Sequence, residues 1–199
     1  MGQRLVVTLE QNEKAVAAIY YHWSAYTYDA LKETKGVIDC IYNGEHETLD
    51  RTLLRLIRYV ESIGGGIRGT DEEFAYIKTL YPGEEFKMDG YSRSCGLIAL
   101  SQDGITTMRG WSEGDVYINL DTDEVDFCVY GGYENLEEYL EDRKEWDDDF
   151  DEDELEDIPQ YDICLGYFST DEIDEILDVI YNNDAHVIQC GTEVCELIE

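Results

Sequence analysis

The sequence predicts an α+β fold, in which an antiparallel β meander packs with about four helices and carries an acidic insertion. Three observations predict it. Apolar residues recur at helical spacing in the first half, short apolar runs separated by turn residues fill residues 97–130, and acidic residues crowd residues 134–157. Together they indicate a single domain spanning residues 1–199, with the acidic segment 134–157 within it.

The beginning of the chain predicts a pair of strands. Leu5–Leu9 and Ala15–His22 are apolar runs, and the polar stretch Gln11-Asn12-Glu13 between them favours a turn. An aromatic cluster overlaps and follows the second run. Its members are Tyr20, Tyr21, His22, Trp23, Tyr26 and Tyr28.

Three helices are predicted next from capping residues and apolar spacing. They are expected to run from Ser24 or Thr27 to about Tyr42, from Thr48 to about Ile63, and from Thr70 to about Leu80. Thr70 and Glu73 have the spacing of a capping box. The glycine-rich stretch 64–69 indicates a helix C-cap followed by a flexible loop rather than a phosphate-binding loop, because it follows a helix and not a strand.

From residue 97 onward, apolar residues occur in short runs that are typical of strands, and not at helical spacing. The expected strands of the meander are Leu97–Leu100, Ile105–Trp111, Val116–Leu120 and Val125–Tyr130, separated by turn residues such as Asp103-Gly104. Beyond the acidic segment we expect a strand at Ile163–Phe168, a helix at 170–182, and strands at His186–Cys190 and Glu193–Ile198.

Negative charge is concentrated in the second half of the chain. Residues 1–110 carry 16 acidic and 12 basic side chains, whereas residues 111–199 carry 31 acidic and 2 basic ones, out of a net charge of −33. Adaptation to high salt would spread acidic residues evenly, and solubility needs a net charge of only about 2–8 in magnitude. Such crowding costs self-repulsion, so we expect a cationic partner to offset it.

The acidic segment is the predicted partner-binding site, although an acidic run can also be a solvated loop. The residues expected to bind are Glu141, Asp142, Glu145, Asp147, Asp148, Asp149, Asp151, Glu152, Asp153 and Glu154. The neighbouring strands are expected to extend this surface with Asp115, Asp121, Asp123, Glu124 and Asp126, and helix 170–182 with further carboxylates. Because duplex DNA carries about one charge per 1.7 Å, a surface dense in carboxylates can compete for a phosphate-binding site.

Other chemistry finds less support in the sequence. The acidic stretches beginning at Asp121 and Asp147 lack the glycine that a calcium loop needs at its sixth position, so we expect no metal and no other cofactor. No local pattern places a cysteine beside His22, His46 or His186, and we therefore predict no enzymatic activity. The arginines of the second helix, Arg51, Arg55 and Arg58, could contact nucleic acid, but we expect them to form a solvated face or to pair with the acidic half of the chain.

The chain also predicts its compartment. It has no apolar stretch of about 18 residues and no secretion signal at its beginning, so we expect neither membrane insertion nor export. The six cysteines include no Cys-x-x-Cys pair, which favours reduced thiols in a cytoplasm.

Two short stretches carry a resemblance to known proteins. Met1-Gly2-Gln3-Arg4 and Tyr20–Thr27, within about the first 30 residues, resemble small proteins of phages and mobile elements of Gram-positive bacteria, a group that includes anti-CRISPR inhibitors of type II effector nucleases. This resemblance implies an inhibitor of a Cas9-type nuclease, which acts in the bacterial cytoplasm. Such nucleases have a basic channel and arginines that read the PAM.

Three hypotheses follow from the sequence. The first is an acidic inhibitor that mimics DNA, binds a basic nucleic-acid site of a host defence nuclease, and does not itself bind nucleic acid. The second is an acidic module for another basic protein, which would not compete with DNA. The third is a small enzyme that uses the aromatic cluster around His22.

Overall fold

The structure is a computed structural model that describes residues 4–25, 27–42, 48–89, 96–128, 160–163, 167–169 and 186–189. The acidic segment 134–157, the predicted helix 170–182 and the predicted strand Glu193–Ile198 lie outside the described residues. Among the described residues, no helix has the length and apolar character to cross a membrane.

An eight-stranded mixed sheet forms the centre of the molecule, with the strand order β4-β3-β5-β2-β1-β6-β7-β9. Its strands are β1 (Leu5–Gln11), β2 (Lys14–Tyr21), β3 (Gly66–Arg68), β4 (Met88–Asp89), β5 (Leu97–Ala99), β6 (Gly114–Asn119), β7 (Glu124–Cys128) and β9 (Tyr167–Ser169). A separate parallel pair joins β8 (Gln160–Ile163) to β10 (His186–Gln189).

The α+β class is confirmed, but the sheet is not a purely antiparallel meander. Strands β1 and β6 run parallel, as do β3 with β5 and β3 with β4, while β1–β2, β2–β5, β6–β7 and β7–β9 are antiparallel. The parallel neighbours arise because helices, and not tight turns, connect several of the strands.

The predicted strand Ile105–Trp111 is wrong, because these residues mostly form helix α4 (Gln102–Arg109). Ser101 caps the helix, and its Oγ accepts the backbone N–H of Gly104 at 3.0 Å. Ile105 and Met108 are three positions apart and pack on the sheet. This helix carries the chain from β5 across to β6, which leaves β6 parallel to β1.

The first hairpin forms as predicted. Asn12 and Glu13 both have positive φ, 51° and 60°, which matches the tight two-residue turns whose twist suits antiparallel strands. The register places Leu5 opposite Tyr21 and Gln11 opposite Lys14, with an irregularity between Leu9 and Glu10.

The predicted helices of the first half are confirmed as α1 (Thr27–Tyr42), α2 (Leu49–Ser62) and α3 (Asp71–Leu80). Helix α2 ends in a Schellman arrangement, in which the N–H of Gly64 bonds to the carbonyl of Glu61 and the N–H of Gly65 to that of Val60. Gly64 has φ of 96°, which glycine adopts without a steric penalty.

The glycine-rich stretch after α2 is not simply a flexible loop, because Gly66–Arg68 form β3. The strand exists through its partners, β5 on one side and β4 on the other. Later in the chain, the described ends of the predicted strand Ile163–Phe168 fall in β8 and β9, which belong to different sheets, and the predicted strand His186–Cys190 is confirmed over His186–Gln189, Cys190 lying outside the described residues.

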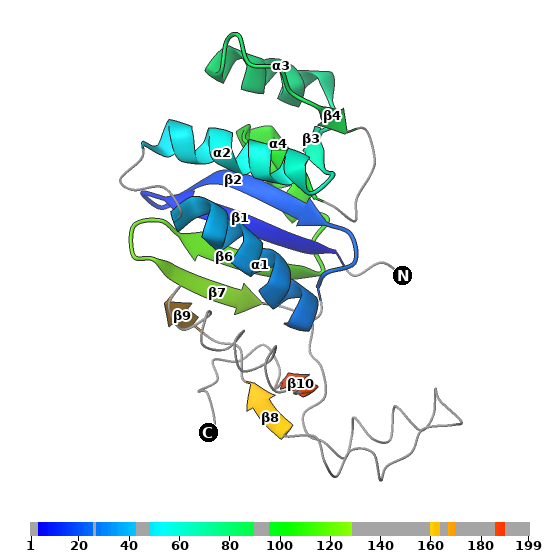
Figure 1. Cartoon of the computed structure of the whole chain (residues 1–199), viewed down its shortest axis with the longest axis vertical. Coiled ribbons are helices and arrows are strands. Elements are labelled where there is room, and N and C mark those ends of the chain that lie inside the picture. The colour runs from blue at the N-terminus through cyan, green and yellow to red at the C-terminus, as the bar shows by residue number, and fades with distance from the viewer. Residues whose placement is uncertain are drawn as a thin grey trace, which may run out of the picture.

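Helices cover both faces of the sheet. Figure 1 shows α1 and α2 in front of the central strands and α4 behind them. The larger core cluster lies under α1 and α2 and includes Leu5, Val7 and Leu9. The smaller cluster lies under α4 and includes Val6 and Tyr20. Strand β1 is therefore buried on both sides, which explains its continuous apolar run.

Candidate partner-binding face

The ten carboxylates predicted to bind a partner all lie outside the described residues, but the strands around them are described. In the chain, β7 precedes the acidic segment and β8 of the separate parallel pair follows it. Strand β9, later in the chain, pairs with β7, with Glu124 opposite Ser169 and Asp126 opposite Tyr167.

Three of the carboxylates expected on strands β6 and β7, Asp115, Glu124 and Asp126, share one face, whereas Asp121 and Asp123 lie in the turn between the two strands and Asp121 accepts the N–H of Asn12 at 2.5 Å. Val116 and Ile118 point into the core under α1 and α2. Because side chains alternate along a strand, Asp115 and Tyr117 point to the opposite face, where α4 lies. Tyr117 is in register with Asp126 of β7. We call the group formed by these strands and their turn the acidic strip. It consists of Asp115, Asp121, Asp123, Glu124 and Asp126.

Two carboxylates of the acidic strip are ionised at a cost to the folded protein. Burial raises the pKa of Asp115, although Ser112 Oγ donates a hydrogen bond to it at 2.8 Å and Arg109 lies near. Its other oxygen, Oδ1, is buried and finds no hydrogen-bond partner among the described residues. Burial alone raises the pKa of Asp126. A cation brought to this face would relieve both carboxylates.

Two arginines of α2 are engaged away from the acidic strip. Arg58 binds Glu61 at 2.7 Å and Glu84 at 2.5 Å, and lies over the ring of Phe86. Arg55 donates to the carbonyl of Ile41 at 2.7 Å. These contacts are with residues of the first half of the chain, and not with the acidic half, the partner expected for the α2 arginines.

Two arginines lie at the border of the acidic strip. Arg4 holds Glu113 through its guanidinium and its backbone N–H, both at 3.0 Å, and this pairing lowers the pKa of Glu113. Arg109, at the end of α4, lies over the ring of Tyr117 with 5.2 Å between its guanidinium carbon and the ring centroid. The guanidinium also donates to the Tyr117 hydroxyl at 3.3 Å.

Four aromatic rings and a guanidinium form a row beside the strip. Trp23 meets His22 edge to face at 4.8 Å, His22 is 6.0 Å from Tyr20, and Tyr20 meets Trp111 edge to face at 5.6 Å between centroids. Arg68 lies over the Trp111 ring at 5.5 Å. We call this group the aromatic row.

His22 is held in the row by its neighbours. Its Nδ1 is 2.6 Å from the Tyr20 hydroxyl, a hydrogen bond that fixes the orientation of the imidazole. Cys40 is buried in the core cluster on the other face of the sheet, so it does not pair with His22 as a nucleophile. Within the described ranges, no three His, Cys, Asp or Glu residues are grouped to hold a metal ion.

Sequence reasoning missed the main role of Glu73, which is 2% exposed. Thr70 Oγ1 accepts the N–H of Glu73 at 3.3 Å, which is one half of the predicted capping box. The Glu73 carboxylate accepts the N–H groups of Leu100 at 2.7 Å and Ser101 at 3.0 Å, and also the Ser101 hydroxyl. It therefore ties α3 to the start of α4. Its partners are 27 and 28 positions away, so local spacing could not reveal them.

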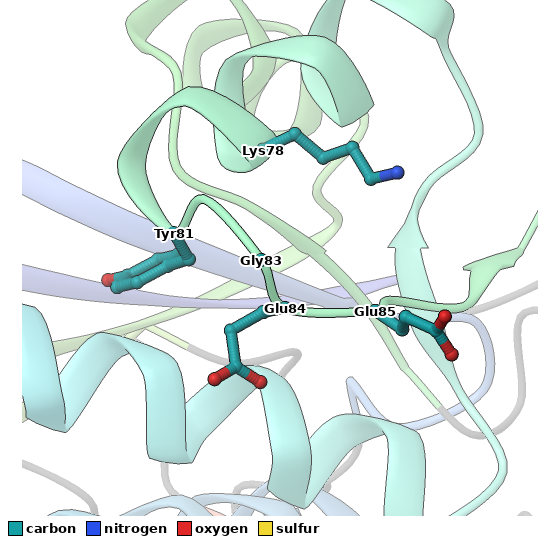
Figure 2. Close-up of a pocket in the computed structure, with 5 residues that line it drawn as sticks. All are labelled: Lys78, Tyr81, Gly83, Glu84 and Glu85. Atoms are coloured by element: carbon teal, nitrogen blue, oxygen red, sulfur yellow. The ribbon is translucent and has the colours of Figure 1, made fainter.

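A hollow of about 280 Å³ lies beside the end of α3 (Figure 2). Its lining residues are Lys78, Tyr81, Gly83, Glu84 and Glu85. Glu84 points toward α2, where it pairs with Arg58. The hollow contains none of the predicted site residues, and the Glu84–Arg58 pair at its edge holds the loop after α3 onto α2.

Comparison of the chain with protein-family models, with curated proteins and with solved structures finds no match.

Proposed function

We propose that this protein is an acidic inhibitor that occupies a basic, nucleic-acid-binding surface of another protein. The observation that supports the proposal is the acidic strip, in which strands β6 and β7 hold Asp115, Glu124 and Asp126 on one face of the sheet, and which comes just before the acidic segment in the chain. The finer partner class, a Cas9-type nuclease of a bacterial host, comes from the sequence resemblance and is part of the same proposal.

The spacing of the strip suits a surface evolved for phosphates. Alternate residues of a strand lie about 6.8 Å apart, and neighbouring strands lie about 4.8 Å apart. One strand of duplex DNA carries a charge about every 3.4 Å along the axis. On this face β7 presents Glu124 and Asp126 at alternate positions, a spacing within about a factor of two of that value, and β6 adds the carboxylate of Asp115. Because the sheet fixes their positions, little ordering entropy is lost on binding.

The raised pKa values of Asp115 and Asp126 support the same proposal. Both carboxylates are partly desolvated without enough positive charge to offset the cost. A partner lysine or arginine would supply that charge and favour the ionised form. The free protein thus bears an electrostatic cost that a basic partner removes on binding.

The test uses a Cas9-type nuclease with its guide RNA and a labelled duplex that contains the PAM. We expect the protein to displace the duplex, as measured by fluorescence anisotropy. Reversing Asp147, Asp148, Asp149 and Asp151 to lysine should abolish displacement. The matched control reverses four exposed carboxylates outside the strip and segment, namely Asp39, Asp71, Glu72 and Glu85.

The two variants change the net charge by the same amount. They therefore distinguish binding through the acidic segment from binding that depends only on the total negative charge. Retention of displacement by the control alone supports the proposal. Equal loss in both variants would show that only total charge matters. Tight binding of a basic protein without displacement of DNA would instead favour the interaction-module hypothesis.

A further inference from the structure

Trp23 is the most exposed large apolar side chain in the described part of the chain, with 54% of its surface accessible. Tryptophan is more often largely buried, and an exposed indole in a folded segment is typical of a binding anchor. Strand β2 ends at Tyr21, and Trp23 lies two positions beyond it, next to His22. Its exposure is not explained by the packing of the fold.

The structure fixes the side of Trp23 that faces the protein. His22 contacts its ring at 4.8 Å, and His22 is itself bonded to the Tyr20 hydroxyl at 2.6 Å. Tyr20 is 5% exposed and belongs to the core cluster under α4, with Trp111 packed against it. The exposed ring therefore stands at the end of a row that is anchored in the core, so binding would lose little side-chain entropy.

The same face of the molecule already binds cations on aromatic rings. Arg68 lies over Trp111 at 5.5 Å and Arg109 over Tyr117 at 5.2 Å. Tryptophan is the strongest partner for such cation–π contacts. With a net charge of −33, the protein attracts cations to its surface and disfavours anionic ligands.

The aromatic row is continuous with the acidic strip along the chain. Trp111 belongs to the row, and Ser112, the next residue, donates its hydroxyl hydrogen bond to Asp115 of the strip. Tyr117 carries Arg109 on the strip itself. The strip adjoins the Trp111 end of the row and Trp23 stands at the other end, so a partner that spans the row would contact the carboxylates and the exposed indole together.

We infer that Trp23 anchors the basic partner by receiving an arginine or lysine side chain on its indole ring. This inference rests on the proposed function and adds a defined contact to it. The acidic surfaces supply long-range attraction, which salt weakens, and the indole supplies a short-range contact that depends much less on salt.

The test records indole N–H resonances of the isotope-labelled full chain by NMR while an octa-arginine peptide is added. Trp23 is assigned with the Trp23→Phe variant. We expect its resonance to shift saturably with the peptide and not with a glycine–serine peptide of equal length. Trp23→Leu keeps an apolar side chain but removes the ring, and should weaken peptide binding about 2- to 30-fold. Tyr76→Ala, which removes a 40% exposed ring from α3, should leave the affinity unchanged.

Several results would overturn the inference. These are an unshifted Trp23 resonance at saturation, equal affinity of Trp23→Leu and wild type, a larger shift with oligo-dT than with the peptide, or a shift that follows protein concentration alone. The proposed function fails separately, if peptide binding does not weaken with added salt and survives charge reversal in the acidic segment. If peptide binding is salt-sensitive but its affinity is unchanged by Trp23→Leu, only the role of Trp23 is contradicted.

Discussion

The carboxylate of Glu73, in α3, accepts the backbone N–H of Leu100 at 2.7 Å, at the point where β5 leads into α4. The bond joins segments that are 27 residues apart in the chain and lie on different layers of the molecule. It holds the N-terminus of α4, the helix that covers the sheet face on which the acidic strip and the aromatic row lie. The stability of this face therefore depends on one buried carboxylate.

Glu73→Ala should lower the free energy of unfolding by about 2–4 kcal/mol. It leaves the buried N–H of Leu100 and the partly buried N–H and hydroxyl of Ser101 without their acceptor, and each such loss costs on the order of 1 kcal/mol. Urea unfolding followed by circular dichroism measures the change. Glu72→Ala, at the exposed neighbouring position, should stay within about 0.5 kcal/mol of wild type. Equal effects of the two substitutions would contradict the role given to Glu73.

Gly104→Ala tests the same junction from the side of α4. An added Cβ would lie 2.1 Å from Glu73 Oε2 and 2.9 Å from the Cβ of Ala99. The Glu73 carboxylate would therefore have to move away from its hydrogen-bond partners. We expect a loss of about 1–3 kcal/mol, the usual cost of overpacking. Gly110→Ala is the matched control, because its nearest contacts are at 3.4 Å and 3.6 Å and its φ is −68°. Unaltered stability of Gly104→Ala would show that the junction is loosely packed.

Asp126→Asn should make the free protein more stable at neutral pH and weaken partner binding. Burial raises the pKa of Asp126 in the folded state above its ordinary value of 3.8, so the unfolded chain loses this proton first as the pH rises. Ionisation of Asp126 therefore lowers the free energy of unfolding at pH values above the pKa of the unfolded chain. It has no effect well below that pKa, where the carboxyl is protonated in both states. The advantage of the variant should therefore appear as the pH rises and vanish toward about pH 3. Thermal unfolding over a pH series measures it.

The control for this prediction is Glu13→Gln, which removes an exposed carboxylate from the first hairpin. It should produce no comparable gain that depends on pH. A wild type more stable than Asp126→Asn at pH 7 would mean that the carboxylate is already compensated within the protein, and the electrostatic argument for a partner would lose this support.

The elements that local patterns define could be predicted from the sequence. The Asn12-Glu13 turn, the helix after Thr70 and the strands around Val116 and Val125 all show capping residues, turn residues or alternation. The acidic strip was predictable for the same reason, because a period of two places Asp115 and Tyr117 on the same face.

The elements that distant partners define could not be predicted in this way. Strand β3 has three residues and depends on pairing with β5 and β4. Helix α4 contains β-branched Ile105, Thr106 and Thr107, which favour a strand by propensity, yet Ser101 capping and the Glu73 contact stabilise the helix. Tertiary contacts decided both cases.

The proposed function requires negative charge at a defined place in the chain, the acidic segment. The salt dependence of duplex displacement tests this requirement most directly. Displacement of the labelled duplex from the nuclease–guide complex should be measured for the four-lysine variant of the acidic segment, the control with the matched charge change, and wild type, from about 50 to 200 mM salt. We predict that inhibition by wild type and by the control falls steeply with salt, and that the segment variant fails throughout. Inhibition by the segment variant equal to that of wild type at every salt concentration would contradict the account.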